Sequence, residues 1–289
     1  MKLEIKLKGI YLKIYFLFKN KLLFKDGYGL SYYLYKNTRP NSTFNLGVRT
    51  DDTTVLYTID KILSSTDLTN SSEIHCIDVG GYIGVVTLMM SKVLKNNEKK
   101  WKIHTFEPFE ESFQRLKENI NLDPYKTNIF LNDMAISDST GTSSLTTYED
   151  SPGETHLENK KLESNKQSTS LKNVKVITLK DYIDQNRIKH VNICKVDTEG
   201  SDYFVIKGLH EHLEKKIVDY FIFEYQFITY DKIKDILSNN GYTIYHMVRN
   251  ENVLIDSLEK YPKNCKSLLN CIAVSSEHNN NFIKKFNLE

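Results

Sequence analysis

Short apolar segments alternate with amphipathic segments through the middle of the chain. The apolar segments have the length and composition of buried strands and lie at 74–79, 102–106, 128–132, 191–196 and 218–224. The segments after them repeat apolar residues with helical spacing and lie at 83–95, 109–121, 180–186, 201–209 and 229–239. Gly241 is placed to end the last of these helices. This order predicts an α/β fold with a mostly parallel sheet and helices on both of its faces.

The regions beside this alternation predict smaller additions to the sheet. Asp51 or Asp52 can cap a helix whose apolar stripe is Val55, Leu56, Ile59, Ile62 and Leu63. Segments 242–248, 253–255 and 271–274 predict antiparallel strands at one edge. Before helix 180–186, the stretches 142–148 and 174–179 alternate like strands, and the polar stretch 149–171 predicts a loop. We therefore expect an N-terminal extension over 1–72, a central domain over 73–248 and a C-terminal extension over 249–289.

The first 24 residues interleave apolar side chains with lysines. The lysines interrupt the apolar run, so the segment is typical neither of a membrane span nor of a signal peptide. It predicts one or two strands, or a helix, packed on the main domain. A basic and apolar segment also suits weak contact of residues 1–25 with an anionic membrane surface.

Composition excludes several classes of protein. The 289 residues include 39 basic and 37 acidic side chains, for a net charge of +2, so nothing indicates nucleic acid as a partner. The four cysteines have neither zinc-site spacing nor the density of a disulfide scaffold. We therefore expect a cytoplasmic protein, with the inner face of a membrane as a second location.

The clearest chemical signal is the glycine-rich turn that follows the first central strand. It begins with Asp78 and carries Gly80, Gly81 and Gly84 before the next helix. Glycines permit unusual backbone angles and close approach, and a helix N-terminus offers unpaired N–H groups to an anionic group. Asp78 would repel a pyrophosphate, so a cationic cofactor such as S-adenosylmethionine fits better than a dinucleotide. The second strand ends at Glu107, where a carboxylate can hydrogen-bond both hydroxyls of an adenosine ribose. If neither residue binds a ligand, Asp78 would be a helix cap and Glu107 an acid at the protein surface.

Over 73–247 the sequence resembles the FkbM family of S-adenosylmethionine-dependent methyltransferases. The family's DVGANIG turn stands here as DVGGYIG at 78–84, and its FEP phrase stands at 106–108. Ala135 to Asp138 and Leu179 to Tyr182 match two further phrases, and KVDTEG at 195–200 matches the family's KxDxEG. Tyr82 departs from the pattern, because it replaces an asparagine that could contact the amino-acid end of the cofactor.

The resemblance implies a Rossmann-like class I methyltransferase sheet, S-adenosylmethionine as cofactor, and O-methylation of a sugar, glycan or secondary metabolite. The residues expected to bind the cofactor are Asp78, Gly80, Gly81, Tyr82, Gly84, Glu107, Asp133 and Ala135.

Methyl transfer to a hydroxyl group requires removal of its proton. Asp197 and Glu199 end the fourth central strand, at the rim where open α/β sheets bind ligands. We expect one of them to act as general base or to orient the acceptor, with Lys195 holding a partner carboxylate. Alternatively, the two acids cap and stabilise the start of helix 201–209. The pair could also bind Mg²⁺, but without an assured third ligand a metal is not expected.

Two other functions compete with methyl transfer. A short-chain dehydrogenase would use a Tyr-x3-Lys pair, but this spacing recurs five times in a chain rich in both residues and carries no information. A methyltransferase-shaped domain without catalysis, serving as a binding or scaffold domain in glycan assembly, is favoured only by Tyr82.

Overall fold

The computed structural model describes residues 15–35, 53–64, 73–147, 156–157, 170–226, 228–248, 253–255 and 268–288. The candidate helix caps Asp51 and Asp52 lie outside the described residues, as do residues 1–14 and most of the predicted loop at 149–171.

The described residues form an eight-stranded sheet in the order β13-β12-β14-β11-β10-β3-β4-β5. Five neighbouring strands are parallel: β11 (Val218–Glu224), β10 (Val191–Val196), β3 (Glu73–Val79), β4 (Lys100–Phe106) and β5 (Ile129–Asn132). They are the five strands predicted from the apolar segments. Three more strands, β12 (Tyr242–Val248), β13 (Val253–Ile255) and β14 (Leu268–Ser275), form the predicted antiparallel edge. Strand β14 lies between β11 and β12, so the last part of the chain completes the sheet.

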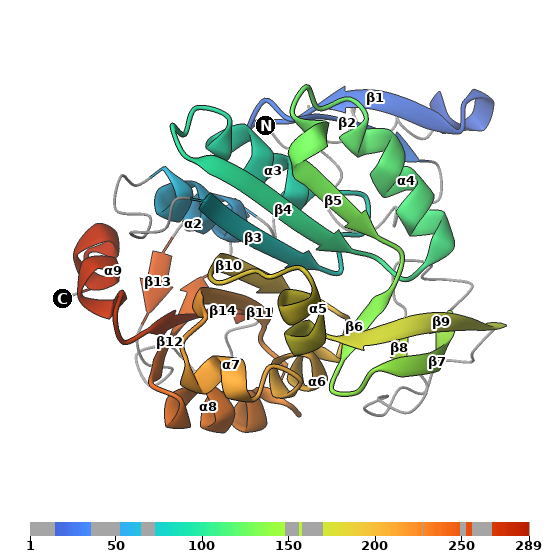
Figure 1. The fold of residues 1–289 in the computed structure, drawn as a ribbon. Coiled ribbons are helices and arrows are strands. Elements are labelled where there is room, and N and C mark those ends of the chain that lie inside the picture. Colours follow the sequence, from blue (N-terminus) through green and yellow to red (C-terminus); the bar gives the residue numbers. More distant parts are fainter. Residues whose placement is uncertain are drawn as a thin grey trace.

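Helices cover both faces of this sheet, as predicted (Figure 1). One face carries α2 (Thr53–Leu63), α3 (Val85–Leu94), α4 (Glu110–Ile120) and α9 (Asn279–Phe286). The other carries α5 (Leu179–Gln185), α6 (Asp202–Lys207), α7 (Glu211–Glu214) and α8 (Tyr230–Asn239). Successive strand residues alternate between the faces: Cys76 packs with the first group of helices and Ile77 with the second. Gly241 follows α8 with φ +77°, as expected for a residue that ends a helix.

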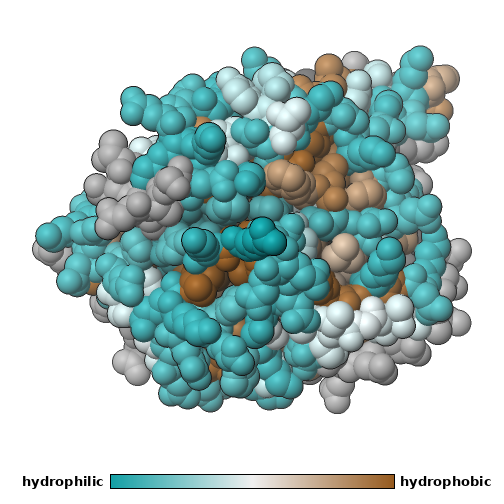
Figure 2. All heavy atoms as spheres, in the orientation of Figure 1, coloured by the Kyte–Doolittle hydropathy of each residue, from teal (hydrophilic) through white to brown (hydrophobic). Residues whose placement is uncertain are grey.

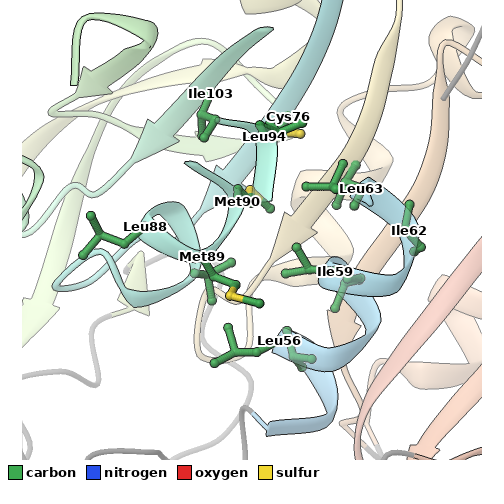
Figure 3. Packing of buried hydrophobic residues seen from close by; sticks show 14 of the residues in the cluster. Leu56, Ile59, Ile62, Leu63, Cys76, Leu88, Met89, Met90, Leu94 and Ile103 are labelled. Carbon is green, nitrogen blue, oxygen red and sulfur yellow. The ribbon is translucent and has the colours of Figure 1, made fainter. Parts of the chain in front are cut away.

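The first face holds the larger of the two apolar cores. The predicted stripe of α2 is fully buried there, and in Figure 3 its Leu56 and Ile59 lie beside Met89 and Met90 of α3. Strand β5 forms the free edge of the sheet, beyond a short 3₁₀ turn (Lys126–Asn128). Hydrophobic atoms reach the surface over this edge (Figure 2), where the side chain of Phe130 is exposed.

A second, smaller sheet lies beside the first, with the order β6-β9-β7-β8. Its strands are β6 (Ala135–Ser137), β7 (Gly141–Thr147), β8 (His156–Leu157) and β9 (Ser170–Thr178). The sequence indicated parts of β7 and β9, but β8 falls inside the stretch expected to be a loop. The reason is that Leu157 pairs with Leu145 and joins a small core with Ala135 and Val176, which isolated apolar residues in a polar stretch do not reveal.

An N-terminal hairpin packs on the first face. Strands β1 (Lys21–Lys25) and β2 (Ser31–Tyr35) are antiparallel, and Tyr32 and Leu34 of β2 join the larger core. The backbone N–H of Tyr33 donates to Asn119 Oδ1 of α4 at 2.6 Å. Of the first 24 residues, for which strands or a helix packed on the main domain are expected, the structure describes 15–24; β1 begins there, and its Phe24 packs against the larger core. Among the described residues no helix is long and apolar enough to cross a membrane.

Candidate functional site

The glycine turn joins the carboxyl end of β3 to α3. Gly80 and Gly84 have φ of +82° and +92°, which side chains disfavour. A Cβ on Gly81 would lie 2.3 Å from Thr105 Cγ2 of the neighbouring strand. A Cβ on Gly80 would lie 1.9 Å from the carbonyl oxygen of Asp197. The space that these glycines leave is thus filled by the protein itself, and the turn is pressed between β4 and β10.

Two further contacts tie this turn to the end of β10. The backbone N–H of Asp197 donates to the carbonyl oxygen of Val79 at 3.0 Å. The ammonium of Lys195 donates to the carbonyl oxygen of Gly80 at 3.3 Å. The glycine turn and the KVDTEG segment therefore form one continuous structure at the rim of the sheet.

Asp78 lies below this junction and is completely buried. Its Oδ2 accepts a hydrogen bond from Thr87 Oγ1 of α3 at 2.6 Å, and Thr87 Oγ1 is also 2.9 Å from Thr105 Oγ1. Its Oδ1 lies 3.5 Å from the ammonium of Lys195. Asp78 is not the cap of α3, because the N-cap of α3 is Gly84. Its carboxylate therefore holds the glycine turn in place through Thr87 and Lys195.

Lys195 supplies positive charge between two carboxylates. Its ammonium lies 3.2 Å from Asp197 Oδ2, in addition to its contact with Asp78, and its side chain is only 9% exposed. A buried ammonium needs such partners, since an unpaired charge there would cost several kcal/mol. Lys195, for which a partner carboxylate is expected, thus lies within 3.5 Å of the carboxylates of both Asp78 and Asp197.

Glu107 follows β4 and turns a buried carboxylate toward the glycine turn. Its Oε2 accepts from the backbone N–H of Tyr82 at 2.9 Å, and its Oε1 accepts from the backbone N–H of Phe109 at 2.9 Å. Burial raises the pKa of this carboxyl to about 7, although the two N–H donors and nearby Lys195 oppose the rise. Each oxygen keeps a second lone pair, so the group can accept two more hydrogen bonds side by side.

Tyr82 adopts the left-handed conformation with φ +48°. Asparagine tolerates this conformation better than most residues, and glycine tolerates it best. The contact that Tyr82 makes with Glu107 uses the backbone N–H, which any residue except proline supplies. The position thus constrains the backbone, a role that reading the side chain alone did not suggest.

Four acids gather where β10 and β11 end: Asp197, Glu199, Asp202 and Glu224. Asp202 joins the two strand ends, because its Oδ1 accepts from the Thr198 N–H and Oγ1 at 2.8 and 2.6 Å and its Oδ2 accepts from the Glu224 N–H at 3.1 Å. Helix α6 begins at Asp202 with Ser201 as its N-cap, so Asp197 and Glu199 lie ahead of the helix and do not cap it. Glu199 has φ +53°, a costly conformation that recurs at functional sites.

Burial changes the ionisation of two of these acids. It raises the pKa of Asp202 to about 6, with Asp197 adding to the rise. It raises the pKa of Glu224 to about 8, and the charges of Asp197 and Asp202 act in the same direction. Sequence reasoning selected neither Glu224 nor Asp202. The signal for Asp202 was an acid in the first turn of the helix that follows KVDTEG.

Two of the residues expected to bind the cofactor lie farther along the rim. Asp133 is exposed directly after β5, and Ala135 is buried in β6. Within the described part of the chain, no group of three or more His, Cys, Asp and Glu side chains is arranged to hold a metal ion. The rim therefore offers a buried acceptor at Glu107, a fixed turn, and an acidic cluster with one lysine.

Comparison with known proteins relates this sequence to one family. Residues 78–244 match the model of the methyltransferase FkbM domain. No curated protein sequence is similar enough to the chain to be matched.

Solved structures match the chain at low sequence identity. The methyltransferase FkbM from Methylobacillus flagellatus KT is 16% identical with a TM-score of 0.45, and the alignment covers 73% of this chain and 45% of that one. The human methyltransferase 10 domain containing protein is 12% identical with a TM-score of 0.49, covering 86% and 89% of the two chains. A SAM-dependent methyltransferase from Agrobacterium tumefaciens is 10% identical with a TM-score of 0.44, covering 89% and 77%. The chain thus spans less than half of the Methylobacillus protein.

Proposed function

Because the chain belongs to the FkbM methyltransferase family, we propose that it transfers a methyl group from S-adenosylmethionine to a hydroxyl group of a sugar, glycan or secondary metabolite. The observation that carries the proposal is the buried carboxylate of Glu107. It faces the glycine turn with both oxygens held by backbone N–H groups.

The residues at the turn fit S-adenosylmethionine. Glu107 retains one lone pair on each oxygen, which suits the two neighbouring hydroxyls of a ribose. The turn over Gly80, Gly81, Tyr82 and Gly84 leads into the N-terminus of α3, where N–H groups favour a carboxylate such as that of the methionine moiety. Asp133 and Ala135 follow the next strand, and we assign them to the adenine end. When bound, S-adenosylmethionine supplies an electrophilic methyl group on a sulfonium.

Asp78 and Lys195 act as positioning residues in this proposal. Asp78 is completely buried and holds Thr87 and Lys195, so it keeps the turn and the KVDTEG segment in register. Lys195 stabilises the ionised form of Asp197 from 3.2 Å. The positive charge of the cofactor would then lie near the carboxylates at the ends of β10 and β11.

The acidic cluster supplies the proton acceptor. A hydroxyl group that gains a methyl group must lose its proton, and we assign Asp197 or Glu199 to receive it as general base. Glu224 lies beside them with its pKa raised to about 8, so it can hold a proton at neutral pH.

Calorimetry and a methyl-transfer assay test the proposal together. We expect the protein to bind S-adenosylmethionine and its demethylated product, and to move radiolabelled methyl onto members of a panel of hydroxylated acceptors. Glu107→Gln should weaken binding, whereas Asp197→Asn should lose turnover and keep binding. Asp184→Asn is the matched control, since Asp184 is a half-exposed acid on α5 that pairs with Lys180 and His212. Absence of binding would refute the proposal, and binding without transfer to any acceptor would favour a scaffold. Full activity in both Asp197→Asn and Glu199→Gln would remove those residues from the catalytic step.

A further inference from the structure

We propose that the N-terminal surface formed by residues 15–25 docks on an anionic lipid bilayer. Large apolar side chains are exposed there: Leu17 is 70% exposed, Phe18 79% and Leu23 55%. Figure 2 shows hydrophobic atoms at its upper right margin, where Figure 1 places the segment that leads into β1. Three such side chains within seven residues form a patch, whereas single exposed apolar residues are ordinary.

The exposure follows from the way β1 is built. Leu22 and Phe24 of β1 are half-buried, and the ring of Phe24 lies 5.9 Å from that of Tyr32 in the core. Lys21, Leu23 and Lys25 alternate with them and point to solvent. The inward-facing side chains of β1 thus pack on the domain. Leu23 belongs to the outward face of the strand, which the described residues do not cover.

The charge of this surface selects its partner. Lys19, Lys21 and Lys25 are exposed, and no acidic residue occurs between positions 15 and 25. The ammonium of Lys21 contacts Glu118 of α4, a pair that remains accessible to solvent, and Lys19 and Lys25 lie beside it along the segment. Lysines near an anionic membrane surface contribute about 1 kcal/mol each, and Leu and Phe side chains that enter the headgroup region add hydrophobic free energy.

The same chain contains a useful contrast. Leu122, Tyr125 and Phe130 are also exposed, but less so, at 39–42%, and both Asp123 and Lys126 lie among them. This surface lacks the lysines with no acid among them that residues 15–25 have, so an anionic bilayer would prefer the N-terminal surface. The inference does not depend on methyl transfer, so the two proposals can fail separately.

Sedimentation of the full chain with lipid vesicles tests the inference. Vesicles of phosphatidylcholine, with and without phosphatidylglycerol, are compared at low and high salt. We expect binding to the anionic vesicles only, weakened by salt. A Leu17→Ser, Phe18→Ser double variant and a Lys19→Glu, Lys25→Glu double variant should each lower the affinity by about tenfold or more. Leu122→Ser should bind as the unaltered protein does. All these side chains are exposed, and an unchanged circular dichroism spectrum and thermal unfolding midpoint will show that each variant is folded.

Three results would overturn the inference. Equal binding to neutral vesicles would remove the role of charge, and unaltered binding in both double variants would move the contact elsewhere on the chain. A dimer in solution that dissociates in the Leu17→Ser, Phe18→Ser variant, without vesicle binding, would identify a second copy of the chain as the partner.

Discussion

The backbone of Gly80 packs directly against the carbonyl group of Asp197, at a separation that excludes even a methyl group. This contact joins the turn assigned to the cofactor with the segment assigned to proton transfer. Lys195 reinforces it from below by binding both the carbonyl oxygen of Gly80 and the carboxylate of Asp197. The two functions proposed for the rim therefore share one backbone junction.

Replacing Gly80 with alanine should separate the two segments. The new Cβ would meet the Asp197 carbonyl oxygen at 1.9 Å, and φ of +82° would be strained as well. We expect Gly80→Ala to lose about 2–4 kcal/mol of unfolding free energy and to weaken cofactor binding by about tenfold or more. Urea denaturation and calorimetry measure the two effects.

Gly241→Ala is the matched control for this change. Gly241 has nearly the same φ, +77°, but its Cβ would meet the flexible end of Lys216 at 3.3 Å and Ser276 Oγ at 3.7 Å. It should lose about 1 kcal/mol and keep full cofactor affinity. Equal losses of stability in the two variants would show that the conformation, and not the Asp197 contact, fixes glycine at position 80.

Cofactor affinity should depend on the ionisation of Glu107. A ribose donates its hydroxyl protons to a carboxylate, and the pKa of this carboxyl is raised to about 7 by burial. Its ionised fraction falls from about nine tenths at pH 8 to about one tenth at pH 6, so affinity should fall several-fold as the pH is lowered. The probe is 5′-methylthioadenosine, which carries the ribose but has no amino-acid group to titrate over this range.

Glu107→Gln supplies the control for the pH effect. Glutamine keeps one acceptor oxygen and cannot titrate, so binding should be weak and independent of pH. A variant whose affinity still falls between pH 8 and pH 6 would show that another group controls binding.

The regular part of the fold was predictable because burial on both faces leaves a strong pattern. Strands β10 and β11 were predicted with their observed bounds, since apolar and aromatic residues dominate both runs; the polar residues are Asn192 and Lys195 in β10, and Asp219 and Glu224 in β11. The position of β14 between β11 and β12 was not predictable, because pairing between distant segments leaves no local mark in the sequence.

The chemistry of the rim was predictable in kind, but its geometry was not. Glu107 and Asp197 were selected because acids at strand ends meet at one edge of the sheet. Asp202 was missed because its partners, Thr198 and the Glu224 backbone, come together only in the folded chain. The space around Gly80 was expected to admit a ligand, whereas it admits the Asp197 carbonyl group.

Tyr82, which replaces the asparagine of the FkbM family pattern, should leave cofactor binding nearly intact. Glu107 accepts a hydrogen bond from the backbone N–H of this residue, and asparagine also tolerates the left-handed conformation of the position. We expect Tyr82→Asn to bind the cofactor within about threefold of the unaltered protein, and Tyr82→Val to lose stability because β-branched residues resist positive φ. Binding that is lost in Tyr82→Asn but retained in Tyr82→Phe would instead assign the role to the aromatic ring.

Asp202 should position the acidic cluster without binding the cofactor. Asparagine at this position keeps one acceptor oxygen, but its amide nitrogen cannot accept from the Glu224 N–H. We expect Asp202→Asn to reduce kcat by about tenfold or more while cofactor affinity, which rests on Glu107, stays unchanged. Loss of the neighbouring charge should also lower the pKa of Glu224 from about 8, which NMR of carbon-labelled glutamate carboxyls can follow directly.

The stability of the same variant gives a second readout with a definite sign. Burial raises the pKa of Asp202 from 3.8 to about 6, so the folded state binds this proton more tightly than the unfolded state. Asp202 therefore contributes stability that is present below pH 3.8 and lost as the pH rises to about 6. Asp202→Asn should lack this part of the slope when denaturation is measured from pH 4 to pH 7. A slope and a Glu224 pKa that both match the unaltered protein would show that Asp202 does not couple the ends of β10 and β11.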